Sequence, residues 1–346
     1  MQVVTASIPK RLTITQSMME DFLCDPVLAA KVLMGYDLDV FQRARLRYNW
    51  WVPFVVDSSG YSTGKTIGQF IYTCLRAMLL PVHDVGVYYP VFETGKSTYW
   101  RYFDRCQAPI FRAHLGGKHM DDEGQSKGKA SNEGGGCYKA WFKTGGTIFM
   151  PAPSFMKKAS TQASLRFGTM VIEEWTHIDA MTPPGEEGGI DAQLIGRVTA
   201  EPWNQHHPLW TNHIKYSAPA KPRSHPGYRR YKALLKKANG IVVNGRLLAG
   251  GDPMYAAISY SYKDWSEEPT ETGKSWAERF RIQSNIDAKK AQTSSPSDWL
   301  GEGLGVWAVS GTGWYREDAV SSAQELGRLA GLKPVTSRAM DEVENK

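Results

Sequence analysis

The most informative part of the sequence is WWVPFVV at residues 50–56, followed by DSSGYSTGKT at residues 57–66. The first segment is a continuous apolar run rich in β-branched and aromatic residues, which is typical of a strand covered on both faces. It stops at a cluster of turn residues. Beyond the cluster, apolar residues recur with helical spacing from Ile67 to Leu79, and Pro81 ends the pattern. We therefore expect a strand, a tight loop and a helix in succession.

The loop between this strand and this helix ends in Gly64-Lys65-Thr66, the close of a phosphate-binding P-loop. In such a loop the amides at the start of the helix face the phosphates, the lysine contacts the β and γ oxygens, and the hydroxyl binds Mg²⁺. The loop is one residue short of the standard pattern, because three residues rather than four separate Gly60 from Gly64. The residues expected to bind ATP in this loop are Ser59, Gly60, Ser62, Thr63, Gly64, Lys65 and Thr66.

Two other Gly-Lys-Ser strings lack this context. The string at 95–97 also lies between a strand-like and a helix-like segment, but the preceding VFET has no glycine that would allow the backbone to approach a phosphate. The string at 273–275 follows SEEPTE, which is not a strand pattern. We therefore assign the nucleotide site to the first string.

Strand and helix patterns alternate along the rest of the first two thirds of the chain. This alternation predicts an α/β fold with a mostly parallel sheet flanked by helices. A helix is expected at 97–106 and a loop at 115–136, where Gly, Lys and Asp are frequent. The expected strands are 85–92, 137–142, 146–151, 167–175 and 208–219.

Two adjacent carboxylates, Glu173 and Glu174, end one of these buried strands. A P-loop enzyme needs such a pair, one carboxylate to hold Mg²⁺ directly or through water and one to polarise the attacking water. Two solvated acids at a strand end are the simpler interpretation when the pair is taken alone. Its position about a hundred residues after a P-loop favours the catalytic interpretation.

Three residues carry weaker signals. Gln42 precedes the P-loop and would read an adenine edge, unless it is an ordinary surface glutamine. Ser217 ends a strand where a polar group would sense the γ-phosphate, unless it is a simple turn residue. Arg166 precedes the acidic strand and would serve as an arginine finger, with a surface ion pair as the alternative. Arg101 and Arg105 are further candidates for the finger.

Composition sets broad limits on the class of protein. The chain has 346 residues, or roughly two domains at about 150 residues each. The formal net charge of +6 favours a polyanionic partner, and 42% hydrophobic residues exclude global disorder. We expect no membrane association, because no apolar run is long enough to span a bilayer. Four scattered cysteines fit reduced thiols in a cytoplasm.

The composition changes after about residue 222 to basic helical pieces and loops rich in Ser, Pro and Gly. We expect a helical segment at 1–35 that packs with a lid, a core at 36–222, and a lid subdomain with a C-terminal linker at 223–346. A helix at 228–238 combines an apolar stripe with many Lys and Arg residues. A solvated face is the default interpretation of these charges, and contact with DNA phosphates is the alternative. No zinc-ligand spacing is present among the histidines.

Taken together in their order, these motifs resemble those of the large terminase, the DNA-packaging ATPase of tailed bacteriophages. Asp39-Val40-Phe41-Gln42 looks like the family's adenine-binding motif, and Gly60–Thr66 like its P-loop. Thr169–Glu174 is similar to its Mg²⁺ and catalytic-carboxylate motif, and Ser217-Ala218-Pro219 to its coupling motif. Asp298 through Trp307 resembles the segment that closes the family's ATPase region.

The resemblance implies an ASCE-type P-loop fold, RecA- or helicase-like, with a small helical lid. It implies ATP and Mg²⁺ as cofactors, with Glu173 on the metal and Glu174 on the water. The implied partners are double-stranded DNA, a portal protein on a procapsid, a small terminase subunit and further copies of the chain in a ring, expected to be a pentamer. The implied place of action is the host cytoplasm. Another nucleic-acid translocase of the helicase type and a non-hydrolysing nucleic-acid-binding module with a degenerate P-loop remain alternatives.

Two departures from the family pattern concern the site. Family P-loops often carry an arginine three residues before the second glycine, where this chain has Tyr61, so a finger from the P-loop itself is not expected. The carboxylate that holds magnesium is usually an aspartate, and here it is Glu173. Large terminases usually add a nuclease domain after the ATPase region; we expect none here, because only about thirty residues follow Tyr315.

Overall fold

The computed structural model describes most of the chain between residues 15 and 307. The described residues are 15–61, 63–80, 82–120, 137–151, 167–177, 209, 212–223, 225, 227–239, 241–243, 246–249, 251–260, 283–293 and 298–307. Their helices are α1 (Gln16–Cys24), α2 (Pro26–Met34), α3 (Val40–Trp51), α4 (Lys65–Leu79), α5 (Phe92–Arg105), α6 (Pro109–His114), α11 (Gly227–Asn239), α13 (Gln283–Gln292) and the π-helical turn η4 (Trp299–Gly303). Their strands are β1 (Phe54–Asp57), β2 (Asp84–Tyr88), β3 (Leu115–Met120), β4 (Cys137–Phe142), β5 (Thr147–Pro151), β6 (Thr169–Glu173), β7 (His213–Ser217), β8 (Ile241–Val243), β9 (Arg246–Ala249) and β10 (Tyr255–Ile258).

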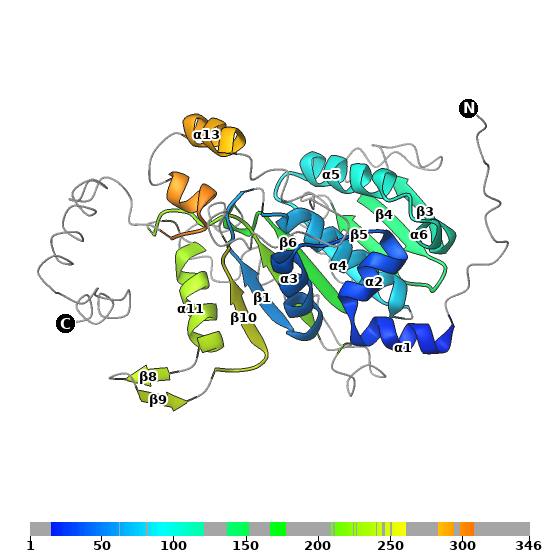
Figure 1. Ribbon diagram of the computed structural model, residues 1–346, viewed down its shortest axis with the longest axis horizontal. Helices are drawn as coiled ribbons and strands as arrows, with labels where there is room; N and C mark the ends of the chain where they lie inside the picture. The colour runs from blue at the N-terminus through cyan, green and yellow to red at the C-terminus, as the bar shows by residue number, and fades with distance from the viewer. Residues whose placement is uncertain are drawn as a thin grey trace, which may run out of the picture.

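Eight of the described strands form one twisted sheet in the order β10-β1-β7-β6-β2-β5-β4-β3, with helices along it (Figure 1). The strands from β10 to β5 pair in parallel, whereas β4 and β3 are antiparallel additions at one edge. The predicted α/β fold with a mostly parallel sheet is confirmed. In this order β7 separates β1, which leads into the P-loop, from β6, which ends in the acid pair.

Both faces of the central strands are buried. Along β6, Val171 packs into the core formed with α1 to α6, whereas Met170 and Ile172 pack into a second core on the opposite face. The second core also takes Tyr228 and Leu234 from α11. Successive strand residues point to opposite faces, so a strand covered on both sides must be apolar throughout, as the sequence pattern indicates.

The three N-terminal helices begin at residues that cap them. Thr15 accepts a hydrogen bond from the Met18 amide at the start of α1. Asp39 and Gln42 form a reciprocal capping box at the start of α3. Among the described residues, no helix is long and apolar enough to cross a bilayer.

Several sequence-based boundaries are wrong. The run at 50–56 is not one strand, because Trp50 and Trp51 end α3 and β1 begins only at Phe54. Trp50 is fully buried on the inner face of that helix, and its indole N–H donates to Leu23 O at 2.9 Å. Aromatic residues pack as well on a buried helix face as in a strand, so the apolar run alone does not distinguish a helix from a strand.

The expected strand at 85–92 ends at Tyr88, because Pro90 has no amide to give to a strand ladder. The helix expected at 97–106 begins five residues earlier, since α5 spans Phe92–Arg105, so the Gly-Lys-Ser string at 95–97 lies inside a helix. The expected loop at 115–136 begins instead with β3, which pairs with β4. Gly116 and Gly117 lie so close to the Trp141 ring of β4 that a Cβ at either position would collide with it, so these glycines allow the two strands to pack. Residues 121–136 lie outside the described part of the chain.

The segment after residue 222 contributes to the main sheet as well as to the surface. Strand β10 pairs in parallel with β1, with Phe54 opposite Tyr255. Helix α11 packs beside it, and β8 and β9 form a separate two-stranded hairpin beyond the end of α11 (Figure 1). Part of the segment assigned to a lid is therefore built into the core.

Candidate functional site

The P-loop occupies the turn between β1 and α4, at the carboxyl end of the parallel strands. Gly64 caps α4 with a left-handed backbone (φ 76°), a conformation that glycine adopts at little cost, and no described side chain caps the helix. The amides of the first turn therefore present the positive end of the helix dipole to an anion. The expected order of strand, loop and helix at Lys65 is confirmed; Ser62 lies outside the described residues.

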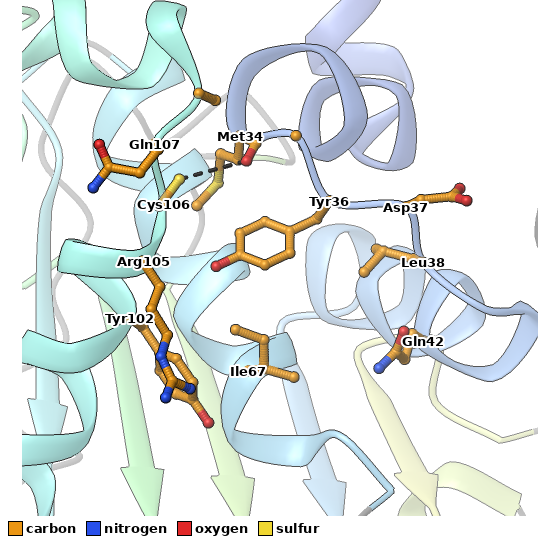
Figure 2. A pocket seen from close by; sticks show the side chains of 12 residues that line it. Met34, Tyr36, Asp37, Leu38, Gln42, Ile67, Tyr102, Arg105, Cys106 and Gln107 are labelled. Atoms are coloured by element: carbon orange, nitrogen blue, oxygen red, sulfur yellow. Dashed lines mark hydrogen bonds between the residues drawn. The ribbon is translucent and has the colours of Figure 1, made fainter. Parts of the chain in front are cut away.

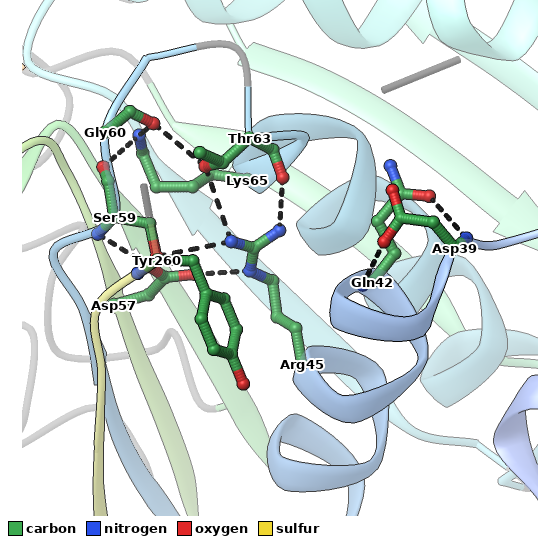
Figure 3. A network of polar contacts seen from close by, with 9 residues as sticks. All are labelled: Asp39, Gln42, Arg45, Asp57, Ser59, Gly60, Thr63, Lys65 and Tyr260. Atoms are coloured by element: carbon green, nitrogen blue, oxygen red, sulfur yellow. Dashed lines mark hydrogen bonds and ion pairs between the residues drawn. The ribbon is translucent and has the colours of Figure 1, made fainter. Parts of the chain in front are cut away.

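Lys65 is folded back onto its own loop. Its Nζ donates to Ser59 O at 2.6 Å and to Gly60 O at 2.8 Å (Figure 3). Burial lowers the pKa of the ammonium to about 8, although the carboxylates of Asp57 and Glu174 act in the opposite direction. A buried lysine of this kind is ready to exchange backbone carbonyls for phosphate oxygens.

A buried arginine on α3, Arg45, holds the P-loop in place through hydrogen bonds. This role was not predicted from the sequence. Arg45 on α3 donates to Asp57 Oδ2 at 2.6 Å, to Thr63 O at 2.6 Å and to Ser59 Oγ at 3.3 Å (Figure 3). Its guanidinium also lies over the Tyr260 ring. Both members of the ion pair are almost fully buried, so each depends on the other for its charge to be tolerated. One available signal was an aspartate that closes an otherwise apolar strand.

The acid pair lies two strands away, at the end of β6. Glu173 is only 1% exposed, and its Oε1 has no hydrogen-bond partner within the described part of the chain. Burial, together with the neighbouring charge of Glu174, raises the pKa of Glu173 to about 8. Glu174 has a left-handed backbone (φ 49°) and is about one-third exposed, with His177 Nε2 3.8 Å from its carboxylate. The two adjacent acids therefore have opposite environments.

A cavity of about 420 Å³ lies between the start of the P-loop helix and Glu174, and Glu173 is not among the residues that line it. Thr66 and Glu174 both line it, together with Tyr61, Tyr89 and His177. The structure thus brings together the hydroxyl and the carboxylate that the sequence analysis assigned to opposite sides of one reaction.

Ser217 ends β7 beside Glu173, its hydroxyl is buried, and hydrogen bonding to this hydroxyl lowers the pKa of the Glu173 carboxyl against the larger effect of burial. The unpaired Glu173 Oε1 and the Thr66 hydroxyl, which lines the cavity, are oxygen atoms of the kind that bind Mg²⁺. No cluster of three His, Cys, Asp or Glu side chains occurs among the described residues, but Mg²⁺ on a nucleotide needs only one or two protein oxygens.

Gln42 is buried rather than on the surface, which excludes the surface interpretation. Its Oε1 accepts a hydrogen bond from the Asp39 amide at 3.1 Å, and a Cβ on Gly64 would lie 2.6 Å from its Nε2. Gln42 lines a cavity of about 350 Å³ between α3, α4 and the end of α5 (Figure 2). Tyr36, Tyr102 and Cys106 are among the other residues around it, so the cavity is largely apolar.

The other candidates are dispersed or not described. Arg166 lies outside the described residues. Arg105 lines the Gln42 cavity, and Arg101 lies one turn earlier on α5. His213 is buried in β7, with Nδ1 3.1 Å from the Tyr72 hydroxyl.

Comparison with known proteins gives similarity at the level of structure. No protein-family model matches the sequence, and no curated protein matches it. In fold, the chain is similar to large terminases. It matches the ATPase domain of the Thermus phage P74-26 large terminase with 12% identity and a TM-score of 0.46, over 86% of this chain and 100% of that domain. It matches the large terminase of another thermophilic bacteriophage, solved in complex with ADP, with 10% identity and a TM-score of 0.45, over 78% of this chain. The chain spans about half of this second terminase, 54% of its length.

Proposed function

We propose that this chain hydrolyses ATP at the cavity between the P-loop and the acid pair. The observation that carries the proposal is that Thr66, at the N-terminus of α4, and Glu174, after β6, line the same cavity. Lys65 lies buried beside them. A phosphate at the start of α4 would then lie between a cation on one side and a carboxylate on the other, which phosphoryl transfer to water requires.

In the proposed reaction Glu174 orients the attacking water and takes its proton, since this carboxylate is partly exposed and faces the cavity. Lys65 leaves the carbonyls of Ser59 and Gly60 and contacts the transferred phosphoryl oxygens. Thr66 and Glu173 would hold Mg²⁺. A Mg²⁺ ion held there would supply positive charge to the phosphates of the nucleotide.

The base of the nucleotide would occupy the cavity lined by Gln42. Gln42 and Ile67 bring this cavity close to the start of α4, and its apolar lining suits a purine. The side-chain oxygen of Gln42 accepts a hydrogen bond from the backbone amide of Asp39. The side-chain Nε2 of Gln42 would therefore be the group that donates to the base.

We further propose that hydrolysis drives double-stranded DNA into a procapsid. In this proposal the chain works as a ring, expected to be a pentamer, on the portal protein, and it cooperates with a small terminase subunit. The order of the motifs and the net charge of +6 support this proposal. Phosphate release measured with and without linear DNA and portal-bearing procapsids tests it, because a packaging motor is stimulated only when both are present.

The test of the ATPase itself is Lys65→Ala. We expect loss of hydrolysis and weaker ATP binding, because the developing charge loses its main cation. Lys96→Ala is the matched control, since Lys96 belongs to the second Gly-Lys-Ser string, which lies inside α5. Parental turnover in Lys65→Ala, or equal losses in both variants, would contradict the assignment.

A further inference from the structure

The segment 298–307, here called the strap, lies directly on the P-loop. Glu302 O, in the π-helical turn, accepts a hydrogen bond from the Tyr61 amide at 2.5 Å. A Cβ on Gly60 would lie 2.1 Å from Gly303 O, so the two backbones are in close contact. The first half of the P-loop therefore has its outer side covered by the strap, whereas the start of α4 faces the cavity.

The C-terminal end of the strap is fixed by aromatic packing. The Trp307 ring lies 5.2 Å from that of Tyr231, 5.5 Å from Tyr228 and 6.0 Å from Trp175. Arg223 Nε donates to Trp307 O at 2.9 Å. The strap thus rests on the same face of the sheet as α11, and it meets the P-loop from a fixed position.

Glu302 connects the strap to two separate parts of the site. Its carboxylate pairs with Lys221 Nζ at 2.8 Å, and both side chains are mostly buried, at 24% and 17% exposed. Lys221 follows β7, four residues after Ser217. The Tyr61 ring, which lies 5.9 Å from Lys65 Nζ, has the same carboxylate as a neighbour; burial and this negative charge raise the pKa of the phenol.

We propose that Glu302 is a positioning residue that holds the P-loop in its nucleotide-binding shape, acting through Tyr61 and fixed in turn by Lys221. The inference rests on the proposed function. A loop held in its bound conformation loses less entropy when the nucleotide arrives, so the strap strengthens binding without touching the ligand. The ion pair with Lys221 also connects the P-loop to the segment that follows β7, the strand that ends at Ser217.

The test measures the Kd of ADP by calorimetry on the full chain, together with KM and kcat for ATP. Glu302→Ala should raise both Kd and KM about five- to tenfold and leave kcat within about twofold. The substitution would weaken the binding of substrate and transition state equally, so the chemical step would keep its rate. Lys221→Met should act in the same direction. The double variant should be no weaker than Glu302→Ala alone, since both changes remove one connection. Glu20→Ala, on α1 far from the strap, is the control.

Glu302→Gln keeps the size of the side chain and an oxygen acceptor, so it tests the charge even if Glu302→Ala does not fold. It should give an intermediate Kd. A parental chain that binds no ADP overturns the proposed function and this inference with it. Parental binding that every variant retains, or additive effects of Lys221→Met and Glu302→Ala, overturns the inference alone.

Discussion

Ser217 on β7 lies directly opposite Glu173 on β6 in the parallel sheet, and on its other side it lies opposite Asp57 on β1. All three side chains are buried, so two carboxylates end the strands on either side of β7 at one level, with the Ser217 hydroxyl between them. Asp57 has Arg45 as its counter-charge. Glu173 has no partner for its Oε1 among the described residues, which makes it the carboxylate that a bound cation would satisfy.

This arrangement predicts different consequences for the two adjacent acids. Glu174→Gln should keep the parental Kd for ADP and lose turnover by at least about 100-fold, because the amide keeps the shape but accepts no proton. Glu173→Gln should instead raise the Mg²⁺ concentration needed for half-maximal rate. Rates measured against Mg²⁺ for both variants check the roles, and exchanged profiles would mean exchanged roles.

The buried ion pair predicts a large loss of stability when one member is removed. Arg45→Met should lower the free energy of unfolding by about 3–5 kcal/mol, because Asp57 keeps a buried charge without a partner. Arg45→Met with Asp57→Leu should recover part of that loss. Urea unfolding is the measurement. Arg43→Met is the control, since Arg43 pairs with Asp37 at 3.9 Å near the surface and should cost no more than about 1 kcal/mol.

The capping box allows the role of Gln42 in base selection to be separated from its role in α3. Asp39→Ala and Gln42→Ala each remove one half of the box and should each cost about 1 kcal/mol of stability. Only Gln42→Ala also removes the amide that faces the base, so it alone should reduce the preference for ATP over GTP, by about fivefold. The ratio of kcat/KM for the two nucleotides is the measurement. An equal change in both variants would assign the effect to the helix.

His83 predicts a loss of stability in acid. The ring is buried, and its Nε2 lies 2.8 Å from Thr169 Oγ1 and 3.4 Å from Arg76 Nη2. Burial and the Arg76 charge hold the pKa of His83 well below its usual value. The unfolded chain takes up this proton below about pH 6.5 and the folded chain does not, so stability falls as the pH drops through that value.

The expected slope from this one group is at most about 1.4 kcal/mol per pH unit. Urea unfolding of the parent and of His83→Gln between pH 5 and pH 8 should show a shallower dependence in the variant. His177→Gln, which changes an exposed ring, should follow the parent. Identical slopes in the parent and His83→Gln would exclude His83 as the source.

The local elements around the site were predictable because each has its own signal. Gly64 and Lys65 stand between an apolar strand and an amphipathic helix; both elements exist, although the strand occupies only the second half of the predicted run at 50–56. The start of α3 was missed, because its capping box was taken only as a motif for adenine and not as the start of a helix that runs to Trp51. Tryptophan pairs occur in either element, so the contacts of Trp50 with distant residues, such as its hydrogen bond to Leu23 O, decide between them.

Contacts between distant segments were not predictable. The sequence YAAI at 255–258 does not indicate that this strand pairs with β1, because its apolar residues suit any half-buried strand. The Arg45–Asp57 pair and the position of Glu302 on the P-loop likewise depend on which segments the fold brings together. Such pairings are set by the whole sheet and leave no pattern in one short window of sequence.

The pairing of β10 with β1 also sets the order in which the molecule can be completed. The Tyr260 amide donates to Ser59 Oγ, a contact between residues 201 positions apart in the chain. During synthesis the contacts on the outer side of the P-loop therefore cannot form until β10, and then the strap, have emerged from the ribosome. Until then β1 has an open edge, and a nascent chain at that stage is exposed to strand pairing with other chains. Nucleotide binding should accordingly be one of the last properties that the growing chain acquires.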